Sequence, residues 1–305
     1  MNYLAFSLLI STFIWSLIYN QALLTIYLIV IGIYLLMNIY YTIRFPGSLR
    51  SKIRIATWND SGDPTVWGRV EVDMTPIDAF LEKYNSEHPD NKLTYTVVFA
   101  KAFGKGLSAA RHLSGKIAFG NFIPSDTVDL SILCDVGGSN LANVLVEGCE
   151  RYSLEQLNEQ IKSKVKTLKL GKDKDFNKQI KTGDYTPSFL VGLILRVTSW
   201  ICYDLGLAFP PLQLKKNNYG TGIITNVTSF DIQDFFGPHV PFLKTIAVAV
   251  MNTPQKKPVV VDGKVEIRKI MNLNIAYDHR FADGADCVKM LKAVEQVFNN
   301  PASYL

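Results

Sequence analysis

The chain has 305 residues, of which 48% are hydrophobic and 19% charged, and its formal net charge is +5. This apolar content is sufficient for a substantial core, and it excludes the disordered and fibrous classes. Charge is unevenly distributed, because residues 1–43 contain no Asp, Glu, Lys, Arg or His. Two physically different regions therefore meet near Arg44.

The charge-free segment, residues 1–43, is typical of a membrane region. A span needs about 20 apolar residues, and Asn20 and Gln21 divide the segment into two runs, residues 4–19 and 22–41. We predict a transmembrane hairpin of two helices. One span preceded by a re-entrant or interfacial segment is the alternative, and a buried pair of core helices is a third interpretation. A secretory signal is not indicated, since a basic start and a small-residue cleavage site are both missing.

Basic residues follow this segment directly, namely Arg44, Arg50, Lys52 and Arg54. By the positive-inside rule they place the large domain on the cytosolic or matrix side of the membrane. We treat residues 44–66 as a basic linker that leads into the domain, and residues 67–305 as the domain itself. We expect membrane lipid as a partner and no nucleic acid.

The cysteine and histidine residues lack the spacing of a metal site. The chain has four of each, without a CxxC motif or paired spacing. Structural zinc sites need such clusters. We therefore expect no metal, and four reduced, mostly buried thiols.

The first half of the domain is predicted to alternate strands and helices. Residues 67–74 alternate as a strand, and Thr75 followed by proline begins a helix. Further along the chain we expect a helix at 96–112, two strands within 116–132, a strand at 141–146 and a helix from Ser153 to Leu170.

For two later segments the sequence allows more than one kind of surroundings. Residues 162–181 contain eight lysines, which indicate either a solvated surface or contact with phosphates or anionic lipid. Residues 187–209 are apolar and aromatic but include Arg196 and Asp204. These two charges argue against a third span, so the segment is interpreted either as an amphipathic helix lying on the bilayer or as a core helix.

The last third of the domain is rich in predicted strands. We expect strands at 219–227, 243–251 and 271–277, a hairpin over 259–268 that turns at Asp262-Gly263, and a final helix at 285–299. This helix is predicted to bury Val288, Leu291, Val294 and Phe298. Strands and helices that do not alternate regularly favour an α+β architecture with a mixed sheet in two layers.

Candidate catalytic residues lie where the last strand meets this helix, in Asp278-His279-Arg280 and Asp283-Gly284. A histidine at the end of a strand can reach a cleft while its backbone is held. It also titrates near neutral pH and can take a proton from a thiol or hydroxyl.

The pattern DHRxxDG at Asp278–Gly284 resembles the motif of the acyltransferase catalytic domain of 2-oxo acid dehydrogenase complexes, a family with the fold of chloramphenicol acetyltransferase. Residues 220–226 resemble a strand of that family, residues 259–264 resemble its hairpin, and the similarity runs from about Arg54 to Leu305. The resemblance implies an α+β fold with a mixed sheet, and an acyltransferase that uses acyl-coenzyme A or another acyl-thioester.

The resemblance also implies roles for individual residues. His279 would be the general base. Thr225 would take the place of the family's serine, whose hydroxyl binds the oxyanion, and Asp283 would form a salt bridge that fixes the loop, with Arg54 as a candidate partner. Asp278, Arg280 and Gly284 would be structural members of the motif. The family forms trimers whose active sites lie between subunits, which implies a homotrimer here.

Departures from the family keep three hypotheses open. In place of a lipoyl domain with its covalently bound lipoyl group, the chain has its membrane segment, and Val227-Thr228 follows where the family has glycines. The first hypothesis is a membrane-anchored acyltransferase. The alternatives are a catalytically silent subunit of a larger membrane complex and a module that binds acyl-coenzyme A without transferring it. Eukaryotic relatives work in mitochondria, which favours the inner membrane with the domain in the matrix. The endoplasmic reticulum and a bacterial plasma membrane are the alternative locations.

Overall fold

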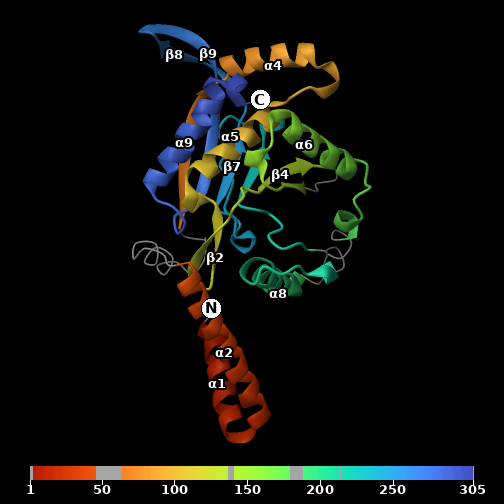
Figure 1. Cartoon of the computed structure of the whole chain (residues 1–305), viewed down its shortest axis with the longest axis vertical. Helices are drawn as coiled ribbons and strands as arrows, with labels where there is room; N and C mark the ends of the chain where they lie inside the picture. Colours follow the sequence, from red (N-terminus) through yellow and green to blue (C-terminus); the bar gives the residue numbers. More distant parts are fainter. Residues whose placement is uncertain (1–2, 46–63, 137–140, 179–187, 213, 305) are drawn as a thin grey trace.

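The structure is a computed structural model that describes residues 3–45, 64–136, 141–178, 188–212 and 214–304. Two N-terminal helices project from an α+β domain (Figure 1). Several sequence predictions lie outside the described residues: the basic residues Arg50, Lys52 and Arg54 and the end of the lysine-rich segment.

The N-terminal helices are α1, Tyr3–Tyr19, and α2, Gln21–Arg44. The side chain of Asn20 accepts a hydrogen bond from the backbone of Leu23 and so begins α2 at the polar break. The two helices contact each other through the hydroxyls of Thr12 and Tyr27, which lie 2.7 Å apart. Among the described residues, α2 alone is both long and apolar enough to cross a membrane.

Within the described residues, the domain is built on a mixed sheet of seven strands. The strands are β1 Thr65–Asp73, β4 Leu130–Asp135, β5 Leu141–Val146, β6 Gly222–Asn226, β7 Ala247–Met251, β8 Gln255–Val261 and β9 Lys264–Asp278. Their order is β1-β9-β7-β6-β4-β5, and β8 pairs with the first half of β9. The strand β6 runs parallel to both of its neighbours, and the other pairs are antiparallel. The predicted mixed α+β sheet is confirmed.

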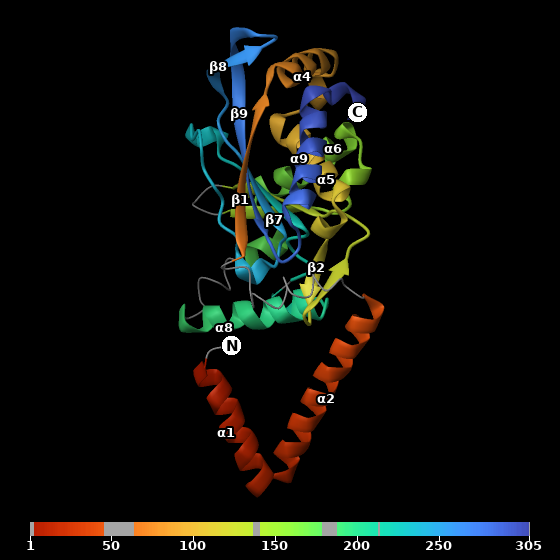
Figure 2. The same cartoon turned by 90° about the vertical axis from the view of Figure 1, so that its left-hand side faces the viewer.

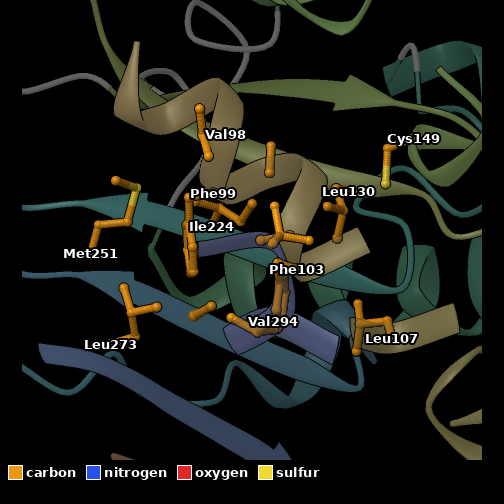
Figure 3. Close-up of a cluster of buried hydrophobic side chains, with 14 of the residues drawn as sticks. Val98, Phe99, Phe103, Leu107, Leu130, Cys149, Ile224, Met251, Leu273 and Val294 are labelled. Atoms are coloured by element: carbon orange, nitrogen blue, oxygen red, sulfur yellow. The ribbon is translucent and has the colours of Figure 1, made fainter. Parts of the chain in front are cut away.

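Helices cover one face of this sheet (Figure 2). They are α4 Thr75–Glu87, α5 Tyr95–Ala109, α6 Leu154–Lys169 and α9 Gly284–Asn299. The main core lies between α5, α9 and the sheet, where Phe99 and Phe103 pack against Val294 and Ile224 (Figure 3). At Gly106 of α5 a Cβ would lie 2.9 Å from a methyl of Val294, so glycine permits the close approach of α5 and α9.

Two strand predictions need correction. The predicted second arm of the hairpin and the predicted strand 271–277 form one strand, β9, because its second half continues into pairing with both β1 and β7. Residues 116–132 hold parts of three strands, since β2 Gly115–Ala118 and β3 Asn121–Pro124 precede β4. Phe119 and Gly120 connect β2 to β3 with positive φ angles of 50° and 73°. A phenylalanine is unusual in that conformation, so the sequence did not indicate the turn.

The last helix also differs from its prediction. Val288 is 50% exposed and Leu291 is half-buried, whereas Met290, Val294 and Phe298 are buried as α9 packs on α5. The helix begins one residue earlier than predicted, because Asp283 caps it. The predicted strands 219–227 and 243–251 are likewise shorter, as the bounds of β6 and β7 show.

The apolar segment predicted at 187–209 forms α8, Ser188–Ser199, and a π-helical turn, Trp200–Asp204. In both views α8 lies at the base of the domain, on the side of the N-terminal helices (Figures 1 and 2). The side chain of Ser199 donates a hydrogen bond to the carbonyl of Phe242, and Lys244 pairs with Asp204. These contacts hold the segment against the domain.

Candidate functional site

The turn after β9 carries the candidate base. Asp278 ends the strand and is 1% exposed, and its amide donates to the carbonyl of Ile246 at 2.9 Å. The amide of His279 donates to the carbonyl of Pro64 at 2.8 Å. These hydrogen bonds to segments on either side of β9 fix the backbone of His279. Its side chain is half-buried.

The ring of His279 is oriented by the carbonyl oxygen of Ala282, which lies 2.6 Å from Nδ1. A carbonyl oxygen can only accept a hydrogen bond, so Nδ1 carries the proton and donates it. In the neutral imidazole, Nε2 then holds the free electron pair. This tautomer is the one that a general base acting through Nε2 requires.

A buried ion pair stabilises the turn around this histidine. The guanidinium of Arg280 donates from Nε to both carboxylate oxygens of Asp278 at 3.1 and 3.0 Å, and from Nη2 at 2.6 Å. The amide of Arg280 also donates to Asp278 at 2.9 Å. A buried carboxylate needs such compensation, because an unpaired buried charge is strongly destabilising. The pair therefore determines the path of the chain on both sides of His279.

Asp283 acts as the N-cap of α9. Its Oδ1 accepts hydrogen bonds from the amides of Ala285 and Asp286 at 3.0 and 3.4 Å, and the side chain of Asp286 bonds back to the amide of Asp283. The salt bridge expected with Arg54 lies outside the described residues and stays a prediction. At Gly284 an added Cβ would meet no described atom within 4 Å, so the structure gives no steric reason for glycine there.

Thr225 lies far from His279 within one chain. It pairs with Val250 of β7, which in turn pairs with Asn274 of β9. His279 is five residues beyond Asn274, or about 17 Å along the strand direction. Thr225 also alternates with the core residue Ile224, so its side chain is on the face of the sheet opposite the helices. The structure therefore does not bring the two predicted catalytic side chains together in one chain.

One neighbouring group, His239, was not indicated by the sequence. His239 is buried, and its Nε2 donates to the carbonyl of Ile246, the same oxygen that the amide of Asp278 bonds. Burial lowers the pKa of His239, so its ring is neutral and structural at neutral pH. The sequence does not indicate that this histidine lies near the motif, because only the pairing of β7 with β9 brings them together.

The cysteines offer no activated nucleophile beside the histidine. All four are free thiols, three are buried, and burial raises the pKa of Cys287, which contacts Tyr277. Across the described ranges, no group of three His, Cys, Asp or Glu residues is placed to hold a metal ion. A cavity of about 360 Å³ lies between β5, α6 and residues 215–219, at the opposite edge of the sheet from β9.

Comparisons with known proteins agree with this motif. Residues 212–305 match the family model of the 2-oxoacid dehydrogenases acyltransferase (catalytic domain). The lipoamide acyltransferase component of the branched-chain alpha-keto acid dehydrogenase complex from Pseudomonas putida is 39% identical over 57 residues, or 19% of this chain and 14% of that protein. The succinyltransferase component of the 2-oxoglutarate dehydrogenase complex from Haemophilus influenzae is 23% identical over 77% of this chain and 48% of that protein. The chain thus matches less than half the length of either relative.

Solved structures show the same fold. A probable dihydrolipoamide acetyltransferase from Listeria monocytogenes superposes with a TM-score of 0.57 at 19% identity, covering 82% of this chain and 88% of that one. The cubic core of a pyruvate dehydrogenase multienzyme complex gives a TM-score of 0.58 at 16% identity over 84% and 88% of the chains. A chloramphenicol acetyltransferase gives 0.50 at 10% identity over 82% and 96%. The chloramphenicol acetyltransferase-like fold and the expected resemblance are confirmed.

Proposed function

We propose, from the similarity of residues 212–305 to the 2-oxoacid dehydrogenase acyltransferase catalytic domain, that this chain is an acyltransferase anchored in a membrane. It uses coenzyme A thioesters, with His279 as the general base. The observation that carries the proposal is the 2.6 Å contact of Nδ1 with the carbonyl of Ala282. With the proton on Nδ1, the lone pair of the neutral ring is on Nε2, which is the atom that takes the proton.

The reaction follows from this tautomer. Nε2 of His279 removes the proton of the attacking thiol, which belongs to coenzyme A or to a dihydrolipoyl acceptor, and the sulfur bonds to the acyl carbon. The carbonyl oxygen becomes an oxyanion. Its collapse breaks the bond to the leaving sulfur, which takes the proton back from His279. No group is oxidised or reduced, and a base in this position contributes a factor of about 10²–10⁴ in rate.

The oxyanion donor comes from a second copy of the chain. Within one chain Thr225 lies about 17 Å along the strand from His279, so the hydroxyl can meet the reacting carbon only across a subunit interface. The hairpin of β8 and β9 supports assembly, since Val260, Val265 and Ile267 are 73%, 73% and 77% exposed. The fold is also shared with the core of a multienzyme complex. A homotrimer is the assembly that we propose.

The N-terminal helices are the anchor. The apolar helix α2 has 24 residues, and its most apolar stretch has no buried residue. That length is about 36 Å of helix, enough to cross a hydrocarbon core of about 30 Å. Arg44 follows the apolar run, which supports a position of the domain on the cytosolic or matrix side. The mitochondrial inner membrane stays a prediction from the resemblance.

The catalytic assignment is tested with the purified full-length chain in nanodiscs, by the release of coenzyme A from acetyl-coenzyme A in the presence of dihydrolipoamide. We expect His279→Ala to lower kcat by a factor of about 10²–10⁴. His112→Ala, which alters an exposed histidine outside the turn, should keep full activity. Equal rates for the parent and His279→Ala would contradict the assignment. The silent-subunit alternative predicts no turnover in any of these proteins.

The composite site is tested by mixing variants. Thr225→Val keeps the shape of the side chain but removes the hydroxyl, and we expect a loss of about 10²–10³ in kcat that Thr225→Ser restores. Co-assembled His279→Ala and Thr225→Val chains should regain activity, because some interfaces then combine an intact histidine with an intact hydroxyl. A mixture as inactive as its components would exclude a site shared between subunits.

A further inference from the structure

The base of the domain presents an apolar surface in addition to that of the β8–β9 hairpin. We call α8 and the π-helical turn that follows it, residues 188–204, the base helix. Leu193, Val197 and Trp200 are 59%, 43% and 51% exposed, and they follow one another at intervals of four and three residues. This spacing places them on one face, together with exposed Arg196. The outward face of the base helix is thus apolar with one cation.

The inward face of the base helix carries both polar and apolar groups, since Cys202 and Tyr203 are buried there beside Thr198 and Ser199. Thr198 and Ser199 are each 6% exposed. The hydroxyl of Thr198 donates to the carbonyl of Ile194 at 2.7 Å, and that of Ser199 donates to Phe242 at 2.7 Å. A helix at a water-facing surface turns polar residues outward, whereas the outward face of the base helix is formed mainly by Leu193, Val197 and Trp200. The base helix is therefore suited to a surrounding less polar than water.

Side-chain contacts fix the base helix relative to α2. The ring of Phe119, at the turn between β2 and β3, stacks on Tyr41 of α2 with centroids 5.6 Å apart. From the same hairpin, Nζ of Lys116 donates to the carbonyl of Tyr203 at 2.7 Å. One β-hairpin thus contacts both elements. Figure 2 shows the result, with α8 running across the base of the domain at the level where α2 ends.

The groups at this level suit the interface of a bilayer. Tyr40, Tyr41 and Phe45 lie at the end of α2, and the guanidinium of Arg44 lies 5.3 Å from the ring of Phe45. Aromatic and basic residues gather where a span leaves the hydrocarbon. Trp200 and Arg196 place the same pair of residue types on the base helix.

We propose that the base helix lies in the headgroup region of the bilayer that α2 crosses. Leu193, Val197 and Trp200 enter the apolar boundary, and Arg196 extends to lipid phosphates. This inference rests on the proposed membrane anchoring and adds a second attachment to it. Two attachments at one level hold the domain in one orientation, with the β8–β9 hairpin farthest from the membrane (Figure 2).

The test measures lipid contact at three exposed apolar positions of the full-length chain. Single cysteines replace Leu193 on the base helix, Ile33 in α2 and Ile267 on β9, which are 59%, 57% and 77% exposed. Each carries an environment-sensitive fluorophore in nanodiscs of phosphatidylcholine and phosphatidylglycerol, with or without doxyl-labelled lipid. The unsubstituted protein measures labelling of the native cysteines, and circular dichroism confirms that each variant is folded.

We expect doxyl lipid to quench the probe at 193 at least twofold when the doxyl group is near the headgroup, and the probe at 267 to be unaffected. Quenching at 33 without quenching at 193 would overturn the inference and leave the anchor in place. A shielded but unquenched probe at 193 would also overturn it, because protein would then cover this face. The absence of quenching at 33 would contradict the membrane anchor itself.

Discussion

The core of the sheet domain and the base helix differ in how far their apolar side chains are buried. In the domain the core residue Phe103 is fully buried. At the base, Leu193 is 59% exposed while Ser199 is 6% exposed. Both regions obey one rule, that side chains match the polarity of their surroundings. The proposed contact of the base with a bilayer would account for this contrast.

The two regions also differ in how they satisfy buried polar groups. In the domain the carboxylate of Asp278 is paired with a guanidinium that is itself mostly buried. At the base, the inward hydroxyls bond to backbone carbonyls. Removing the partner of a buried charge lowers the free energy of unfolding strongly, because the remaining charge is left unpaired. Removing a neutral hydroxyl that bonds to a carbonyl lowers it less. Mutations should therefore have graded effects on stability in the two regions.

The largest expected difference in stability is between variants of one apolar residue from each region. Phe103→Ala should lower the free energy of unfolding by about 3–5 kcal/mol, because it leaves a cavity in the core. Leu193→Ala should change it by less than about 0.5 kcal/mol in detergent, since it removes only exposed surface. Urea denaturation followed by circular dichroism measures both. Similar losses of unfolding free energy in the two variants would show that Leu193 belongs to a core and would contradict the difference between the two regions.

The next effect concerns the turn that holds His279. Asp278→Asn removes the charge that Arg280 bonds, and we expect a loss of about 2–3 kcal/mol in the free energy of unfolding. Glu71→Gln is the control, because its pair with Lys257 is exposed and should contribute at most about 1 kcal/mol. An equally small change in unfolding free energy for Asp278→Asn would mean that the buried ion pair contributes little to the stability of the turn.

Acidification should weaken the domain through His239. Burial holds the pKa of this histidine below its usual value of 6.5, so the unfolded chain binds the proton first as pH falls. Its contribution to stability is complete above about pH 6.5 and declines below it, by at most about 1.4 kcal/mol per pH unit. His239→Gln should reduce the loss of stability between pH 7 and pH 5.5. An unchanged pH profile would refute this role.

The smallest expected effect lies at the base. Ser199→Ala removes the hydrogen bond to Phe242 and should lower the free energy of unfolding by about 1 kcal/mol. Ser108→Ala is the matched control, because its exposed hydroxyl bonds only within its own helix. A loss at Ser199 as large as that at Asp278 would show that the inward face of the base helix is part of the main core.

Local patterns predicted much of the fold. Ser153 caps α6 through a capping box with Gln156, as its position before an amphipathic run indicated. Asp262 and Gly263 form the β8–β9 turn with φ angles of 50° and 79°, as this dipeptide predicts. The turn at Phe119 was missed because its conformation is sustained by packing on Tyr41, a residue 78 positions away.

The candidate site was predictable in its residues but not in its geometry. The motif indicated His279, yet its tautomer depends on the carbonyl of Ala282. Asp283 was expected to form a salt bridge, and the hydrogen bonds described for its side chain cap α9. The distance between Thr225 and His279 follows from the pairing of β6, β7 and β9, which no local pattern contains.

The sequence by itself determined the features that depend on neighbours along the chain: a charge-free segment of 43 residues, helix caps, the Asp262-Gly263 turn and the motif around His279. These signals are local, because side chains a few residues apart share a helix turn or a β-turn. Only the tertiary structure decided which nitrogen of His279 carries the proton, that Thr225 lies remote from it, and that the apolar face of α8 points outward. Each of these depends on contacts between segments that are distant in sequence.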